Sequence, residues 1–415
     1  MEVHCTGELA MPTTVTDPYD ILQASILSRP RMMGSAGEAE TIRFLKDFLK
    51  KHNLHPSTEE FTWSTAFVSG RKYLYLLLGV LAILFNISLR LAQPLNGILT
   101  IVLVVVAISV LVFGMKGLLH DKFKGLGKSF QGENVLCDVP SRNNEKDAPL
   151  IYFTAHYDSI SSNHPKLNTI SMMALLLGFI LSVLLTLTSV ILNLSDYANA
   201  AWNGQPTIHV INLTLLIFSA VVVSLSIFSQ FIERTNSSPG ACDNGSGSAI
   251  LLSLAAHFQQ QPPAHTRLKF IWCGAEEWGL YGSKGYVKAH QEEIAAGCER
   301  SCVINVDMVG SELAYLQKSG FIFQKPLNKQ LNVLIAQCAE EADIAARPFN
   351  SVIGGNSDHA SFQKEKVEVC FFLSNKDTKI IHSPQDTIEK VKPEKMADAV
   401  ELIKRMVTKL DKQFL

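Results

Sequence analysis

Charged residues are scarce in this sequence. Only 18% of its 415 residues are Asp, Glu, Lys or Arg, a smaller share than soluble globular proteins typically carry. The formal net charge is −1, so the chain lacks the basic excess that marks a nucleic-acid-binding surface. We therefore expect no nucleic-acid partner. The length would accommodate two or three domains.

Cysteine is also sparse and has no regular spacing. The eight cysteines fit neither a zinc finger nor a dense disulfide framework. Several of them, such as Cys273, Cys302 and Cys370, lie in apolar runs, which indicates buried free thiols and a reducing compartment. The segment Met1–Asp20 also lacks the basic and then apolar pattern of a cleaved signal peptide.

Long apolar runs, by contrast, occur in four places. Each run approaches the ~20 residues that a helix needs to cross a bilayer. Buried core helices are the alternative, but such helices are seldom this free of charge. We predict an integral, multi-pass membrane protein, with the lipid bilayer as a partner and two transmembrane hairpins at residues 71–116 and 167–232. The four runs are Tyr73–Leu89, Ile98–Met115, Ile170–Leu192 and Ile208–Phe228.

The remaining segments, 1–70, 117–166 and 233–415, then lie on one side of the membrane. Basic residues flank the runs on this side, whereas Arg90 alone stands on the other. Because cytoplasmic flanks are enriched in Lys and Arg, this bias predicts that the large polar domain faces the cytoplasm. The flanking basic residues are Arg71, Lys72, Lys116, Lys122, Lys124, Lys128, Lys166 and Arg234.

Outside the apolar runs, short strands alternate with helical patterns. This alternation predicts an α/β domain with a mostly parallel central sheet and flanking helices. The expected strands are Asn134–Val139, Leu150–Ala155, Leu268–Cys273, Cys302–Val306 and Val369–Leu373. The expected helices cover about 17–27, a segment opened by Ser35, a segment ending near Phe258, 281–296, 327–345 and 392–410.

Polar residues of metal-ligand type follow several of these strands, where open α/β sheets place their sites. Two histidines and three carboxylates suit a pair of zinc ions with one bridging carboxylate. Asp158, two residues after the first histidine, fits a carboxylate that orients the imidazole. Glu276 remains free to move a proton. The five candidate ligands are His156, Asp243, Glu277, Asp307 and His382.

Taken singly, each of these residues has a simpler explanation. Glu276 and Glu277 could open a helix, where the macrodipole favours acidic residues. His156 could be a histidine of a surface loop, and Asp243 could be the N-cap of the helix that follows it. The case for a metal site therefore depends on the set of residues together.

The set resembles metallopeptidase family 28, the co-catalytic zinc aminopeptidases. The resemblance covers about residues 17–70, 130–166 and 236–410, and leaves out the four apolar runs. It implies a zinc-exopeptidase-like fold. The matching motifs are His156-Tyr-Asp-Ser159, Gly240-Ala-Cys-Asp-Asn-Gly-Ser-Gly247, Glu276-Glu-Trp-Gly-Leu-Tyr-Gly-Ser283, Asn305-Val-Asp-Met308, Ser357-Asp-His359 and His382-Ser-Pro-Gln-Asp-Thr387.

The resemblance also implies a role for each residue. Asp243 would bridge the two zinc ions. His156 and Asp307 would complete one site, and Glu277 and His382 the other. Glu276 would be the general base, and Asp158 would orient His156. His359 is a rival ligand to His382.

The implied activity is that of a membrane-anchored, zinc-dependent aminopeptidase acting on peptide substrates. Two alternatives stay open: a glutaminyl-cyclase-like acyltransferase, and a non-catalytic receptor or scaffold. Cobalt or manganese could take the place of zinc in such a donor set. The side-chain preference and the oligomeric state stay open as well.

Overall fold

The structure is a computed structural model that describes residues 16–91, 95–119, 124–145, 148–198, 206–320, 324–351 and 356–413. Two compact units are present. The first comprises the chain up to Trp63, Phe130–Ser161 and the chain from Arg234 onward. The second comprises Ser64–Ser129 and Ser162–Glu233. The second unit is therefore built from two insertions into the first.

The first unit is organised around a sheet whose centre is parallel. Its strand order is β1-β2-β6-β3-β7-β11-β8-β10, with β9 paired to β8. The four central strands, β6, β3, β7 and β11, are parallel to one another, while β2 and β8 join them antiparallel. The predicted mostly parallel centre is confirmed. The strands are β1 (Ser57–Ser64), β2 (Ser129–Val139), β3 (Leu150–His156), β6 (Arg267–Cys273), β7 (Ser301–Val306), β8 (Leu313–Ser319), β9 (Lys325–Pro326), β10 (Ala346–Ser351) and β11 (Glu368–Leu373).

The central strands form because their apolar runs are covered on both faces. Every residue of β3 and β7 is buried, as expected for parallel strands with helices on each side. The five predicted strands all occur, within one residue at each end except β2, which begins five residues earlier than predicted. The outer strands β1, β8 and β10 were not predicted.

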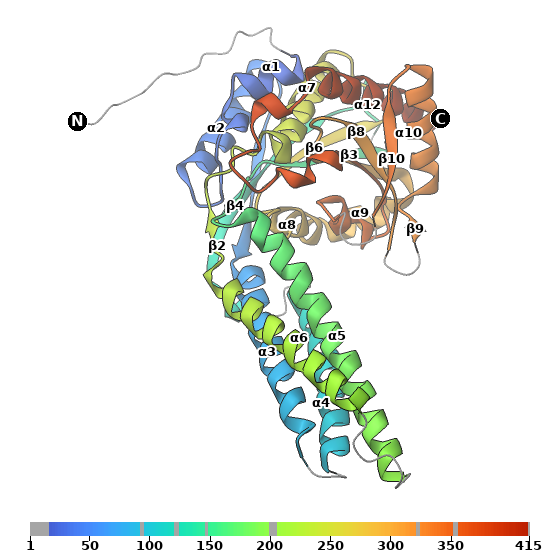
Figure 1. Ribbon diagram of the computed structural model, residues 1–415. Helices are drawn as coiled ribbons and strands as arrows, with labels where there is room; N and C mark the ends of the chain where they lie inside the picture. The colour runs from blue at the N-terminus through green and yellow to red at the C-terminus, as the bar shows by residue number, and fades with distance from the viewer. Residues whose placement is uncertain are drawn as a thin grey trace, which may run out of the picture. The chain divides into compact units, whose positions relative to one another are not determined.

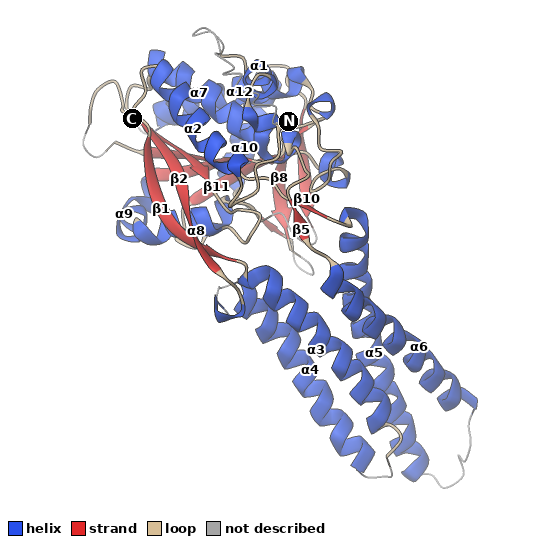
Figure 2. Ribbon diagram, turned by 90° about the vertical axis from the view of Figure 1, so that its left-hand side faces the viewer, coloured by secondary structure: helices blue, strands red, loops and turns tan. Residues whose placement is uncertain are grey.

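Helices cover both faces of the sheet. In Figures 1 and 2, α1 (Pro18–Gln23), α7 (Gly247–Gln260) and α12 (Pro393–Gln413) lie on one face, and α8 (Tyr281–Ala289) and α9 (Gln291–Gly297) on the other. The helical structure expected over 281–296 is present, but it is divided at His290 into two helices, α8 and α9. The remaining helices are α2 (Ala36–Lys51), α10 (Lys329–Glu341) and α11 (His359–Gln363).

The helix opened by Ser35 has the predicted cap. Ser35 Oγ accepts the Glu38 N–H at 3.4 Å. The Glu38 carboxylate accepts the N–H of Gly34 instead of that of Ser35, one residue before the position that a regular capping box uses. The N–H groups of Gly34 and Glu38 therefore both have side-chain acceptors, and α2 begins at Ala36.

The second unit consists of four long helices. These are α3 (Ala66–Ser88), α4 (Leu95–Leu119), α5 (Pro165–Ala198) and α6 (Pro206–Phe228), and each extends beyond the apolar run that predicted it at one or both ends. Their neighbours in space are α3 with α4 and α6, and α5 with α6. All four are long and apolar enough to cross a membrane.

Hydrogen bonds between polar side chains tie these helices together. Asn86 on α3 donates to Ser219 Oγ on α6 at 2.7 Å, and Ser189 on α5 donates to Asn212 on α6 at 2.7 Å. Ser88 Oγ lies 2.8 Å from Thr100 Oγ1 on α4. Such contacts satisfy polar groups that would otherwise be costly in an apolar bundle.

Candidate metal centre

The predicted ligands come from the carboxyl ends of the central strands and from two loops beside them. His156 is the last residue of β3, and Asp307 follows β7 directly. Glu277 lies four residues beyond the end of β6. Asp243 precedes α7, and His382 lies in the loop after β11. The topology thus brings residues far apart in sequence to one edge of the sheet.

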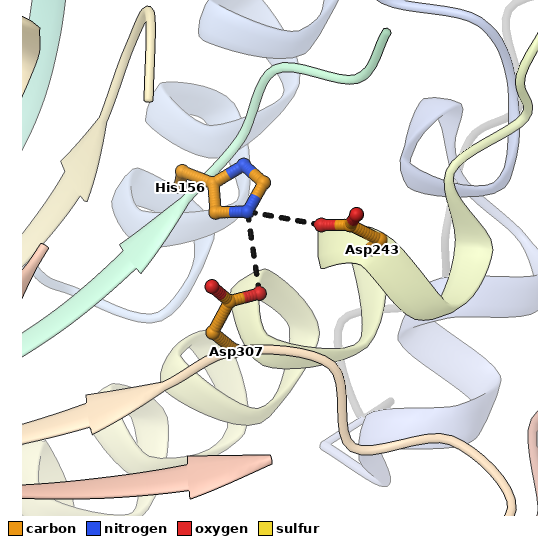
Figure 3. A group of neighbouring side chains, drawn as sticks. All are labelled: His156, Asp243 and Asp307. Carbon is orange, nitrogen blue, oxygen red and sulfur yellow. Dashed lines mark hydrogen bonds and ion pairs between the residues drawn. The ribbon is translucent and has the colours of Figure 1, made fainter. Parts of the chain in front are cut away.

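His156, Asp243 and Asp307 form the first group of possible metal ligands. His156 Nε2 lies 3.1 Å from Asp243 Oδ1 and 3.3 Å from Asp307 Oδ1. Figure 3 shows the three side chains pointing toward one another from β3, from the loop after β7 and from the turn before α7. All three residues are buried.

Asp243, Glu277 and His382 form the second group. His382 Nε2 lies 3.1 Å from Asp243 Oδ2 and 3.0 Å from Glu277 Oε2. In each group the ligand atoms lie within 4.8 Å of one another. Asp243 belongs to both groups and turns a different carboxylate oxygen to each histidine. The structure thus brings all five predicted ligands together, in the two groups implied by the family resemblance.

The chemistry of these donors fits zinc, which binds imidazole nitrogen and carboxylate oxygen. Asp243, Glu276, Glu277 and Asp307 place four carboxylates beside only two histidines in a largely buried site. Such a concentration of like charge is costly without a compensating cation. In addition, Glu277 Oε1 is buried and has no hydrogen-bond partner among the described residues, although buried acceptors are normally satisfied.

The protonation states follow from this crowding. Burial alone would lower the pKa of His156, but the nearby carboxylates of Asp307 and Glu276 outweigh it and raise the pKa well above its usual value. Burial would raise the pKa of Asp243, yet its hydrogen bonds with His156 and His382 hold the pKa below the usual range. Asp243 therefore stays ionised, the form that binds a cation.

Glu276 belongs to neither group of ligands. Its Oε2 lies 4.0 Å from His156 Nε2, and 12% of its side chain is exposed, so it borders the first group and reaches solvent. Burial of most of the residue, together with the charges of Asp307 and Glu277, raises its pKa well above the usual value for a glutamate. A carboxylate with a raised pKa beside a reaction site is suited to accept and return a proton.

The loop that carries both glutamates is closed at its base. The Gly282 N–H donates to Gly274 O at 2.9 Å, and Asn134 on β2 bonds both ends, accepting from Gly274 N and donating to Gly282 O. A Cβ at Gly282 would collide with Asn134 Oδ1 and with Gly274 O. The close approach of these two glycines therefore fixes both ends of the loop that carries Glu276 and Glu277.

Asp243 is held by its main chain and does not act as an N-cap. No side-chain capping bond is present, and α7 begins only at Gly247. Asp386 accepts the N–H groups of Cys242 and Asp243 at 2.7 and 3.1 Å. Burial, with the charge of Asp243 close by, raises the pKa of Asp386 to about 7. The His382-Ser-Pro-Gln-Asp386 motif thus supplies both a candidate ligand and a support for the bridging residue.

Arg31 is a second support that the sequence did not reveal. Its guanidinium is fully buried and donates to four main-chain carbonyls, those of Arg29, Tyr157, Pro239 and Gly240. Burial lowers its pKa to about 10, so the group stays charged at neutral pH. It joins the residue after His156 to the turn before Asp243.

Asp158 approaches His156 through both its main chain and its side chain. The nearest acceptor to His156 Nδ1 is the main-chain oxygen of Asp158 at 3.1 Å, whereas its carboxylate lies 3.6 Å away. The Asp158 carboxylate also accepts the N–H of Glu276 at 3.2 Å. The main-chain oxygen thus makes the shorter contact with the imidazole, and the carboxylate lies between the imidazole and the glutamate loop. Asp158 is a positioning residue.

His359, the rival ligand, belongs to neither group among the described residues. It is buried, its ring stacks on Phe371 with centroids 4.7 Å apart, and its Nδ1 lies 3.5 Å from Asn305 Nδ2. Burial lowers its pKa to about 3. His359 is therefore a neutral core histidine, and His382 is the histidine that lies in the second group of possible ligands.

Asp377 joins the two loops that follow β7 and β11. Its carboxylate accepts the N–H of Ser311 at 2.6 Å, the hydroxyl of Ser311 at 2.7 Å and that of Ser374 at 2.5 Å. The first loop carries Asp307 and the second carries His382. One ligand of each group is thus supported by the same buried carboxylate, a link that no motif indicated.

Comparison with known sequences finds similarity to peptidases over part of this chain. Residues 219–407 match the sequence profile of Peptidase family M28. Aminopeptidase YwaD of Bacillus subtilis is 31% identical over 172 residues, which is 40% of this chain and 36% of that protein. A probable leucine aminopeptidase of Arthroderma benhamiae is 34% identical over 200 residues, 45% of this chain and 53% of that protein. The matches span only about a third to a half of these relatives.

Solved structures show the same fold at low identity. An aminopeptidase from Aneurinibacillus sp. strain AM-1 superposes with a TM-score of 0.54 at 17% identity, covering 95% of this chain and 93% of that one. A zinc aminopeptidase from Bacillus subtilis gives 0.54 at 16% identity over 96% and 95%. An Acidobacteriales glutaminyl cyclase gives 0.53 at 14% identity over 96% and 94%. The last two structures have different named activities. The similarity therefore supports the fold of this chain but does not indicate its reaction.

Proposed function

We propose that this protein is a membrane-anchored, metal-dependent aminopeptidase that holds two zinc ions and hydrolyses the N-terminal bond of peptides. The observation that carries the proposal is the placement of Asp243. Its two carboxylate oxygens lie 3.1 Å from two different histidines, in two groups of three possible ligands. A shared carboxylate between two donor groups is suited to a two-metal site.

In the proposed reaction, His156 and Asp307 would hold one ion, Glu277 and His382 would hold the other, and Asp243 would contribute to both groups. Zinc bound there would supply Lewis-acid activation of the scissile carbonyl and of the attacking water. Glu276 removes a proton from that water as its oxygen attacks the carbonyl carbon. When the C–N bond breaks, Glu276 returns the proton to the departing amine. No covalent bond to the protein is needed.

Several contacts support these roles. Asp386 and Arg31 fix the main chain around Asp243. The closed base of the glutamate loop holds Glu276 beside the first group of ligands. Because catalytic groups must stay in position during the reaction, this network of buried bonds favours an enzyme over a scaffold that has lost its chemistry.

The anchor is the second part of the proposal. The second unit has four helices of suitable length and hydropathy, and many of their large apolar side chains are exposed. Ile98 and Val105 on α4, for example, are more than half exposed. Exposed apolar surface of this extent is typical of a membrane-facing surface. We propose that α3–α6 cross the bilayer and that the first unit faces the cytoplasm.

The activity can be tested with the full chain purified in detergent. It would be offered peptides that differ only in their N-terminal residue, together with an N-acetylated copy of the best substrate. We expect free N-terminal amino acids from the unblocked peptides, none from the acetylated copy, loss of release with a chelator and recovery with zinc. Loss of ammonia from an N-terminal Gln peptide without amino-acid release would indicate the cyclase reaction instead. No turnover by the zinc-loaded protein would contradict both.

A further inference from the structure

A polar pocket lies between α3 and α6 in the four-helix unit. It has a volume of about 220 Å³ and opens beside the last turn of α3. That volume is several times the ~30 Å³ that one water molecule takes in the liquid, so it can hold a group of phosphate size. The lining residues are Asn86, Leu89, Arg90, Asn212, Leu213, Leu215 and Leu216.

The pocket is rich in hydrogen-bond donors. Within the described chain, the Arg90 guanidinium makes no hydrogen bond or ion pair, and its backbone is fixed by an N–H bond to Ile87 O at 3.0 Å. The Asn212 side chain uses its oxygen to accept from Ser189, which leaves its NH₂ group for a ligand. Asn86 already donates to Ser219 Oγ and Ala82 O. The available groups are thus mainly donors, and one is cationic.

The rest of the lining is apolar. Four leucines complete the wall, and no acidic side chain is among the lining residues. Leu213 and Leu216 are largely exposed beside the pocket. An anion that fits the donors would therefore have apolar helix surface next to it. A free inorganic anion would make no favourable contact with that apolar surface, whereas the acyl chains of a lipid could pack against it.

We propose that this pocket binds the headgroup phosphate of an anionic phospholipid, with Arg90 and Asn212 donating to the phosphate oxygens and the leucines contacting the acyl chains. The inference goes beyond the peptidase reaction and rests on the proposal that α3–α6 cross a membrane. Arginine suits the role because its planar guanidinium can donate two parallel hydrogen bonds to a phosphate. Arg90 lies just past the end of α3 and is exposed, so its long side chain can reach a headgroup at the membrane interface.

Native mass spectrometry of the full-length protein in detergent tests the proposal. Phosphatidylglycerol and phosphatidylcholine with the same acyl chains would be added in equal amounts, and the lipids that stay bound would be counted. We expect the wild type to retain phosphatidylglycerol preferentially. Arg90→Gln should reduce that retention about tenfold or more, since a hydrogen bond to a charged group is lost, and Arg90→Lys should retain part of it.

Two matched variants serve as controls. Arg71→Gln removes a positive charge from the other end of the same helix and should leave retention unchanged. Ser189→Ala and Asn212→Leu both remove the hydrogen bond between Ser189 and Asn212. Only Asn212→Leu also removes the Asn212 amide, so only this variant should weaken lipid retention. Thermal unfolding of every variant shows that the bundle is intact.

Three outcomes would overturn the proposal. The first is equal retention of the two lipids by the wild type. The second is wild-type retention of phosphatidylglycerol by a folded Arg90→Gln. The third is displacement of the lipid by inorganic phosphate alone, which would make the pocket a site for a free anion. None of these outcomes depends on peptidase turnover, and a protein without any peptidase activity would still be expected to retain the lipid.

Discussion

Two adjacent glutamates in this structure have different surroundings. Glu277 Oε2 lies 3.0 Å from His382 in one group of ligands, while Glu276 Oε2 lies 4.0 Å from His156 and belongs to neither group. Consecutive residues at the end of a strand point in different directions, which allows one to bind metal and the other to move protons. The pair therefore provides its own matched control.

Glu276→Gln should reduce turnover by ~10²–10⁴-fold, because general acid–base catalysis is lost, while the zinc content stays at the wild-type level. Glu277→Gln should instead lower the zinc content, because a ligand is lost. Steady-state peptide hydrolysis and elemental analysis on the same preparations check both. Near-wild-type turnover by Glu276→Gln would show that another group is the base.

The candidate ligands could be predicted from the sequence, but the residues that support them could not. His156, Asp243, Glu277, Asp307 and His382 could be found because polar residues follow apolar strands in a recognisable set of motifs. Arg31 could not, since an arginine in a loop is usually exposed and its partners are all main-chain carbonyls. Carbonyl acceptors have no side-chain signature. For the same reason, the contact of the Asp158 main-chain oxygen with His156 could not be predicted.

Among the elements, the turn between β6 and α8 sets the position of both glutamates. Gly274 and Gly282 meet at its base, with Asn134 of β2 bonded to each of them. A Cβ at Gly282 would collide with Asn134 Oδ1 and Gly274 O, and a Cβ at Gly274 would collide with the Tyr157 hydroxyl. The geometry of the site thus depends on two small residues that take no part in the reaction.

Gly282→Ala should move this turn and lower both stability and activity. Overpacking of a tight site costs ~1–3 kcal/mol, and displacement of the glutamates should reduce turnover as well. Gly297→Ala is the control, because a Cβ there would meet nothing closer than Ser301 Oγ at 3.4 Å. Denaturant unfolding and peptide hydrolysis would be compared for the two variants. A Gly282→Ala protein as stable and active as Gly297→Ala would refute this role of the turn.

Central elements were predicted better than outer ones. The buried strands β3, β6, β7 and β11 appear as apolar runs that end in polar motifs. The strands β1 and β10 lie at the ends of the sheet and are partly exposed, so their sequences, Ser57–Ser64 and Ala346–Ser351, carry polar residues and, in β10, a proline. Proline and charge are tolerated at sheet edges, and such strands resemble loops when only sequence is considered. The break between α8 and α9 at His290 could not be predicted, because no proline or glycine stands at that position.

At the scale of the whole molecule, a sheet domain is interrupted twice by pairs of apolar helices. The seven described cysteines are free, as predicted, and six of them are buried. The helices were recognisable from length and lack of charge alone, whereas the three interhelical side-chain bonds within the bundle were not. Residues such as Asn86 and Asn212 weakened the hydropathy signal where they tie the helices together.

The orientation of the helices can be tested by cysteine labelling. Eight basic residues flank the four apolar runs on the side of the first unit against Arg90 on the other, so we expect that unit in the cytoplasm. A cysteine at Asn203, between the predicted apolar runs Ile170–Leu192 and Ile208–Phe228, should react with an impermeant thiol reagent in intact cells if the protein is in the plasma membrane. Asn143→Cys should react only after the cells are opened. The reverse pattern would place the first unit on the outer or lumenal side.

Zinc counting in the wild type and in Asp243→Ala tests the central claim most directly, since one carboxylate is proposed to serve two ions. Full-length protein would be stripped with a chelator, reloaded with zinc, dialysed and analysed for zinc per chain. We predict two zinc ions in the wild type and loss from both positions in Asp243→Ala, with peptide hydrolysis lost in parallel. Two fully retained ions in Asp243→Ala, or fewer than two in a fully active wild type, would contradict the shared carboxylate.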